Sequence, residues 1–184
     1  VQMGFLPEAI VNYVALLGWN PGDEREIFTM EELIEAFDIE RINKSSAAFS
    51  LEKLTWLNGE HIRRLDPQKF HELALKYYPE GVRHLDLEKI SRLIQIRIER
   101  FTEIPTMVKF LYELPDYDAA LFENPKSKST LQSSREILQE VIPLLESMQE
   151  WTNESLFTAL KDFATAHDYK IGTVMWPIRT ALSG

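Results

Sequence analysis

Apolar residues recur every three or four positions along most of the chain, which is the spacing of one face of an α-helix. The first such stripe consists of Ile10, Val11, Val14 and Leu17. It lies between Pro7, which suits the first turn of a helix, and Gly18, which suits the position just after the last turn. Alternating β-branched positions are nearly absent, so we expect any strand to be confined to the first 50 residues.

The segment after this first helix carries a capping box. Thr29 provides a hydroxyl, and Glu32 provides a carboxylate three residues later, which together satisfy free backbone amides at a helix start. The pattern predicts a short helix that turns Leu33, Ile34 and Phe37 inward.

Two more helix starts follow within the next 40 residues. Ser50 should cap a helix that ends or bends near Asn58-Gly59. Asp66 followed by Pro67 is the pairing of a capping side chain with a first-turn proline, and it predicts a new helix there.

The longest predicted helix of the first half begins at Asp86 and extends to about Phe101. Its apolar residues cover more than one face, so we expect it to be buried between neighbouring helices. Pro105 should begin another short helix, and the polar, proline-containing stretch 115–129 is a predicted loop or linker.

The last third of the sequence again has helical periodicity. We expect helices over 131–148, with a kink or a fresh start at Pro143, then after Thr152, and over 173–182. The sequence therefore predicts an all-α protein, a helical bundle or cage of about eight to ten helices in two or three small subdomains.

Composition narrows the class of protein. The 184 residues include no Cys, and 20 Lys and Arg against 29 Asp and Glu give a net charge of -9. Disulfide scaffolds and bulk-charge binding of DNA or RNA are therefore not expected, whereas a local basic patch is compatible with this net charge. No apolar run approaches the roughly 20 residues of a membrane span, and no signal segment is visible, so we expect a cytoplasmic protein without membrane contact. The first residues, Val1-Gln2-Met3, resemble the middle of a sequence, and we expect a fragment.

Catalytic and metal-binding patterns are missing from the sequence. The four histidines are not spaced as metal ligands, and neither a nucleophile motif nor a glycine-rich phosphate loop is present, so we assign no catalytic residue, metal or cofactor to this chain. The run Lys126-Ser127-Lys128-Ser129 is one residue shorter than the Lys-Met-Ser-Lys-Ser loop of class I aminoacyl-tRNA synthetases and lacks its Met, and we expect an exposed surface loop.

Basic residues remain as candidates for binding. Five of them fall within two dozen residues: Arg41, Lys44, Lys53, Arg63 and Arg64. They could hold RNA phosphates or form an ordinary solvated helix face. Arg97 stands among apolar neighbours, where its fixed fork of donors could bind a ligand or pair with Glu103.

Three runs resemble one known family. The first comprises Gly4 to Ala9, Asn12-Tyr13 and Ala15 to Trp19, and the others are Asp23 to Phe28 and Phe49 to Gly59. Looser matches lie at 150–152, 176–179 and 181–184. These runs resemble bacterial-type glutamyl-tRNA synthetases, in the region that follows the catalytic Lys-Met-Ser-Lys-Ser loop.

The resemblance implies a division of labour along the chain. Residues 1–64 would contact the tRNA stem, and residues 65–127 and 128–184 would form two helical anticodon-binding subdomains. The catalytic domain would precede Val1 and further residues would follow Gly184, so this fragment would lack the catalytic centre. The parent enzyme would use ATP and Mg²⁺ to join glutamate to tRNA-Glu, and we expect a monomer that does not bind DNA.

The resemblance also implies roles for individual residues. Asn43, Lys53 and Trp56 match positions that contact the tRNA stem, and Arg179 matches an arginine that packs among the anticodon bases. Arg97 matches the arginine that recognises the third anticodon base, and a gap in the local alignment would transfer this role to Arg100. The alternative function is a helical adaptor that binds proteins and keeps this fold without RNA specificity.

Overall fold

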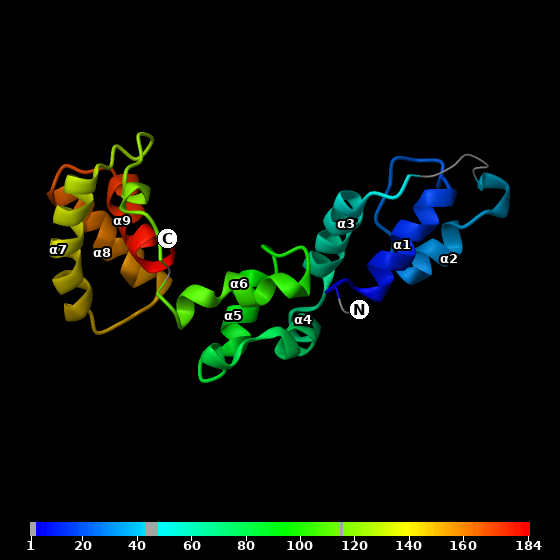
Figure 1. The fold of residues 1–184 in the computed structure, drawn as a ribbon, viewed down its shortest axis with the longest axis horizontal. Coiled ribbons are helices and arrows are strands. Elements are labelled where there is room, and N and C mark those ends of the chain that lie inside the picture. Colours follow the sequence, from blue (N-terminus) through cyan, green and yellow to red (C-terminus); the bar gives the residue numbers. More distant parts are fainter. Residues whose placement is uncertain (1–2, 43–47, 115) are drawn as a thin grey trace. The chain divides into compact units, whose positions relative to one another are not determined.

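The computed structural model describes residues 3–42, 48–114 and 116–184 (Figure 1). These residues form nine α-helices and six short 3-10 helices. Two isolated β-bridges, Trp19 with Ile42 and Asn124 with Ser129, join extended residues, and the described part of the chain contains no strand. The all-α prediction is confirmed, and the number of α-helices lies within the predicted range.

The chain forms two compact units, Val1–Tyr112 and Glu113–Gly184, called here the N-terminal and C-terminal units. The N-terminal unit contains α1 (Pro7–Gly18), α2 (Met30–Ala36), α3 (Leu51–Arg64), α4 (Pro67–Ala74), α5 (Leu87–Ile94) and α6 (Ile104–Met107). Its 3-10 helices are Ile39–Arg41, Leu75–Tyr77, Glu80–Val82, Phe101–Glu103 and Lys109–Leu111. The functional boundaries expected near residues 64 and 127 stay a prediction.

The core of the N-terminal unit forms where α1 packs on α3 and α4 packs on α5. Its fully buried side chains include Leu57, Ile62, Phe70, Val82, Ile98 and Ile104. Burying apolar surface of this kind supplies most of the free energy of folding, at roughly 25 cal/mol per Å². The predicted caps Thr29, Ser50 and Asp66 all accept backbone amides at the starts of their helices.

Two details near the N-terminus differ from the prediction. Gly18 is the last helical residue of α1, and the residue after it, Trp19, is extended because its buried ring joins Phe28 and Leu33 in a small core. In α2 only Leu33 is buried, whereas Ile34 is 73% exposed and Phe37 half exposed, so the inward orientation predicted for these two is wrong.

Helix α3 does not end at Asn58-Gly59, as the sequence suggested, but continues to Arg64. The Asn58 side chain is fully buried, where it accepts a hydrogen bond from the Leu6 amide (2.8 Å) and donates to the Glu99 carbonyl. Gly59 lies where a Cβ would be 3.0 Å from the Glu99 side chain. Both residues therefore serve helix packing and not helix termination.

The long helix expected from Asp86 to Phe101 is also wrong, because α5 ends at Ile94. The next residue, Gln95, donates through its side-chain amide to the carbonyls of Ile62 (3.0 Å) and Leu65 (2.8 Å) at the end of α3. The Leu65 carbonyl is one that a helix end leaves free, whereas the Ile62 carbonyl also accepts the Leu65 amide (3.2 Å). The chain turns at this point. The side chains of Leu93 and Ile96 are exposed, so α5 is not enclosed on all sides.

The C-terminal unit is built from α7 (Leu131–Ser147), α8 (Asn153–Ala166) and α9 (Ile171–Ser183), preceded by a 3-10 helix at Ala119–Phe122. The three helices pack together around Ile137, Val141, Leu160, Ala164 and Val174. Thr130 and Thr152 cap α7 and α8 with their hydroxyls. Helix α7 continues through Pro143, and α9 begins two residues before the predicted start.

Candidate nucleic-acid interface

Charge is distributed unevenly along the chain. Residues 60–112 carry ten Lys and Arg against eight Asp and Glu, whereas residues 1–59 carry four against ten, and residues 113–184 carry six against eleven. Only the middle segment is positive, and it contains α4, α5 and the turn that follows them. An acidic protein that contacts polyanionic RNA is expected to do so through such a local segment.

The basic stretch predicted around residues 41–64 is largely neutralised. Lys53 pairs with Glu26, Arg63 with Glu60 and Arg41 with Asp38. Such exposed or partly exposed pairs contribute little to stability, about 0–1 kcal/mol each. Each Lys or Arg can therefore exchange its carboxylate partner for a phosphate. Arg64 is exposed and has no ion-pair partner among the residues that the structure describes. Asn43 and Lys44 lie outside those residues.

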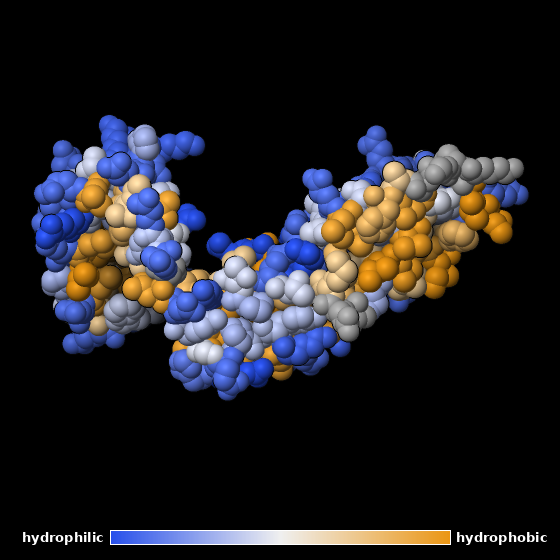
Figure 2. Space-filling model, viewed as in Figure 1, coloured by the Kyte–Doolittle hydropathy of each residue, from blue (hydrophilic) through white to orange (hydrophobic). Residues whose placement is uncertain are grey.

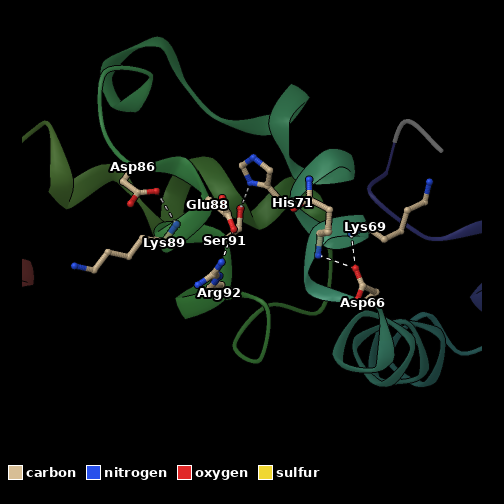
Figure 3. Close-up of polar contacts among 9 residues, drawn as sticks. Asp66, Lys69, His71, Asp86, Glu88, Lys89, Ser91 and Arg92 are labelled. Atoms are coloured by element: carbon tan, nitrogen blue, oxygen red, sulfur yellow. Dashed lines mark hydrogen bonds and ion pairs between the residues drawn. The ribbon is translucent and has the colours of Figure 1, made fainter.

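Helices α4 and α5 lie side by side and present charged side chains (Figure 3). Asp66 accepts the backbone amides of Gln68 and Lys69, and Asp86 accepts that of Lys89. These carboxylates stabilise the helix starts, where the helix dipole favours negative charge.

The junction between α4 and α5 contains a Ser-His contact that the sequence did not reveal. His71 Nδ1 lies 2.8 Å from Ser91 Oγ, and the Tyr78 hydroxyl lies 2.9 Å from the same atom (Figure 3 shows the first contact). Burial raises the pKa of Tyr78, and the hydrogen bond with Ser91 lowers it by a smaller amount. Ser91 is only 1% exposed, so a substrate does not reach its hydroxyl, and the contact holds the two helices together.

Arg97 and Arg100, the two candidates for the third anticodon base, differ in their surroundings. Arg100 Nε lies 3.2 Å from Glu103 Oε1, and Glu103 also accepts the Glu99 amide (3.0 Å). The ion pair considered between Arg97 and Glu103 is therefore wrong. Arg97 is exposed, and within residues 3–42, 48–114 and 116–184 its guanidinium has no hydrogen-bond or ion-pair partner.

A pocket of about 440 Å³ lies between α3 and the segment after α5. Its lining consists of Leu51, Glu52, Thr55, Trp56, Glu99 and Arg100, and we call it the Trp56 pocket. The fold thus brings together Trp56, expected at the tRNA stem, and Arg100, considered for the anticodon. The sequence offers no signal for this contact, because the two residues belong to segments far apart in the chain.

In the C-terminal unit, Arg179 projects from α9 and is exposed. Its side chain has no partner among the residues that the structure describes. The indole N–H of Trp176, three residues earlier, donates to the Leu121 carbonyl (2.9 Å). This bond fixes this part of α9 against the 3-10 helix Ala119–Phe122. The loop 124–129 is a tight turn tied to α9, since the Thr173 hydroxyl donates to the Ser127 carbonyl (2.6 Å).

Exposed apolar side chains gather over α1, α2 and the start of α3 (Figure 2). They are Val11, Val14, Ile34, Phe37, Ile39, Ile42, Phe49 and Leu51. A contiguous apolar surface of this kind usually contacts another protein segment.

Metal sites and membrane-spanning helices are both absent from residues 3–42, 48–114 and 116–184. No three His, Asp or Glu side chains there come together as a metal site. None of the helices found there has both the length and the apolar character needed to cross a membrane.

Comparison with known families places these features in context. The family model described as "Anticodon binding domain" matches residues 69–184, and the model described as "tRNA synthetases class I (E and Q), catalytic domain" matches residues 1–56. The first match covers more than half of the chain, and this chain belongs to the anticodon-binding domain family. The resemblance inferred from the sequence runs is confirmed.

Individual relatives agree with this assignment. The chain is 48% identical over 182 residues to a glutamate–tRNA ligase of Clostridium botulinum (strain Hall), covering 98% of this chain and 38% of the relative. It is 44% identical to the corresponding ligase of Clostridium novyi, with 100% and 39% covered. The crystal structure of a glutamate tRNA ligase from Elizabethkingia meningosepticum superposes with a TM-score of 0.80 at 29% identity, covering 97% of this chain and 36% of that one. The chain thus spans less than two fifths of the length of these relatives.

Proposed function

We propose that this chain is the tRNA-binding region of a glutamate–tRNA ligase, which contacts the stem and the anticodon of tRNA-Glu. The observation that carries the proposal is the anticodon-binding family match over 69–184, in which Arg97 and Arg179 are both exposed and without partners in the described part of the chain. The complete protein would activate glutamate with ATP and Mg²⁺, and this region would select the tRNA. We expect it to act in the cytoplasm as a monomer.

The chemistry of the two arginines fits this role. Unpaired anticodon bases are recognised on their Watson-Crick edges and by stacking on side-chain planes. A guanidinium offers donors only, so Arg97 can donate to O2 and N3 of a cytosine, whereas guanine presents its own donors there. Arg179 follows Trp176 by three residues on α9, and the bond from the Trp176 indole to the Leu121 carbonyl anchors the part of the helix from which Arg179 projects.

Titration of the chain with tRNA-Glu and with an unrelated tRNA tests the proposal. Binding should favour tRNA-Glu and weaken with salt, since each phosphate contact adds about 0.7–0.9 to the log-log salt slope. A helical protein adaptor, the alternative function, would show no preference between the two RNAs.

Arg97→Gln tests recognition of the third anticodon base. Binding is compared for tRNA-Glu and a variant with guanine at that base, which the wild type should bind less well. Glutamine can both donate and accept, so the discrimination should fall by about 1–3 kcal/mol, as for base-edge contacts in general. Arg92→Gln is the matched control, since Arg92 is an exposed arginine of α5 already paired with Glu88. Equal discrimination in Arg97→Gln and wild type would contradict the assignment.

Lys53→Ala tests the contact with the stem. The variant should weaken binding of all tRNAs alike and make the salt slope shallower by about one contact. Glu26→Gln removes the carboxylate that pairs with Lys53 and should have the opposite effect on affinity. If neither variant changed the salt slope, Lys53 would not contact the RNA and would only form its ion pair with Glu26.

A further inference from the structure

We propose that the Trp56 pocket binds one ribonucleotide of the RNA, with its base on the Trp56 indole and its phosphate at Arg100. The proposal rests on the RNA-binding function above and adds a defined subsite to it. It also assigns Arg100 to the same stretch of RNA as Trp56, and leaves Arg97 as the residue for the anticodon.

The walls of the pocket are held in place by buried contacts. Asn58, fully buried on α3, donates to the Glu99 carbonyl and so binds the segment 99–100 to the helix. Gly59 allows this close approach, because a side chain there would press on Glu99. A pocket whose two walls are fixed before binding loses little conformational entropy when a ligand enters.

The groups that face a ligand are an aromatic surface and an oriented cation. Trp56 is 39% exposed on α3, so part of its ring is available for stacking with any base. Arg100 is oriented by Glu103, which engages only its Nε. The terminal guanidinium nitrogens have no other partner among the described residues, and such a fork suits a phosphate oxygen.

The remaining lining residues narrow the class of ligand. Glu52 and Glu99 add two carboxylates, which disfavour a ligand that offers only anionic acceptors, such as free phosphate. The same carboxylates, together with the Thr55 hydroxyl, can accept hydrogen bonds from a ribose 2′-hydroxyl or an exocyclic amine. A nucleotide within RNA satisfies both the cation and the carboxylates, and its 2′-hydroxyl is the group that distinguishes it from DNA.

The test measures binding of labelled tRNA-Glu to the 184-residue chain and its variants. Trp56→Ala and Arg100→Ala should each weaken binding about tenfold, in the range of losing one stacked base, and Trp56→Phe should keep most of the affinity. Because both residues hold the same nucleotide, the double variant should lose much less than the product of the two single losses. Arg25→Ala, which removes an exposed arginine paired with Glu32 in the acidic segment 1–59, is the control and should change affinity less than threefold.

Two further measurements separate this proposal from its competitors. A scan of single 2′-deoxy substitutions in the tRNA should find one position that weakens binding to the wild type but not to Trp56→Ala. The loss in Arg100→Ala should be the same whichever base stands third in the anticodon, and a loss that depends on that base would return Arg100 to the anticodon and overturn the proposal.

Failure of the proposal differs from failure of the proposed function. If the wild type binds tRNA-Glu selectively while neither Trp56→Ala nor Arg100→Ala weakens binding, the pocket is not an RNA site. If the wild type itself shows no selectivity, the proposed function fails. Circular dichroism melts of each variant detect unfolding, and Arg100→Lys, which keeps the charge without the fork, should still weaken binding if Arg100→Ala proves unstable.

Discussion

Asn58 is the residue whose replacement should most directly test how the N-terminal unit is held together. It lies in the middle of α3 with its amide fully buried. Its Oδ1 accepts the Leu6 amide at 2.8 Å, and its Nδ2 donates to the Glu99 carbonyl. Asn58→Ala removes both bonds and therefore disconnects the segments of Leu6 and Glu99 from this helix.

The loss in the free energy of unfolding follows from the two backbone groups that Asn58→Ala leaves without a hydrogen bond. The Leu6 N–H is buried, and a buried group without a partner costs about 1–3 kcal/mol. The Glu99 carbonyl is only partly buried and can be hydrated, so we add about 0.5–1 kcal/mol for it. Alanine favours the helix over asparagine by about 0.5 kcal/mol, which offsets part of this loss. The free energy of unfolding should therefore fall by about 2 kcal/mol.

The assay is urea unfolding followed by tryptophan fluorescence. Trp151 and Trp176 belong to the C-terminal unit, so replacing both with Phe leaves Trp19 and Trp56 to report on the N-terminal unit alone. Amide hydrogen exchange of Leu6 provides a second, local measurement, and its protection should fall in Asn58→Ala.

Gln68→Ala is the matched control for this experiment. It also removes a side-chain amide from a helix of the same unit, but Gln68 is exposed and should change stability by less than about 0.5 kcal/mol. An Asn58→Ala variant as stable as this control, with unchanged protection of Leu6, would refute the reasoning.

Two further predictions concern backbone strain and pH. Gly4→Ala should destabilise the unit by roughly 1–3 kcal/mol in the same urea assay, because Gly4 has φ +78° and a Cβ there would lie 2.7 Å from the Thr102 amide nitrogen. Gly18→Ala, where a Cβ would meet nothing within 4 Å, should be neutral or stabilising, and equal losses in both variants would contradict this. Burial lowers the pKa of His61 below its usual 6.5, with a smaller contribution from Arg64 in the same direction and an opposing one from Glu8. The unfolded chain therefore takes up the proton first, so His61 costs the wild type stability as pH falls below 6.5, and His61→Gln should lose less between pH 7 and pH 5. A pH dependence identical in the two proteins would show that His61 does not contribute.

The sequence by itself determined most helix starts and the family. Thr29, Asp66 and Thr152 cap helices as predicted, because capping depends on side-chain groups within three residues of the helix start. The runs near the N-terminus resembled the family that the comparisons identify, since such runs are visible without a structure. The exposure of Arg179 and Arg97 agrees with the binding roles proposed for them, which the experiments above test.

The tertiary structure alone decided where α5 ends and which charges pair. Helix α5 ends where the Gln95 side chain donates hydrogen bonds to carbonyls at the end of α3. Glu103 forms its ion pair with Arg100 and not with Arg97. The Trp56 pocket likewise exists only because Asn58 draws the segment 99–100 onto α3. The contacts of Gln95 and Asn58 join residues 30 to 41 positions apart in the sequence. Local periodicity carries no information about them, because a side-chain hydrogen bond depends on distances that only the packed fold establishes.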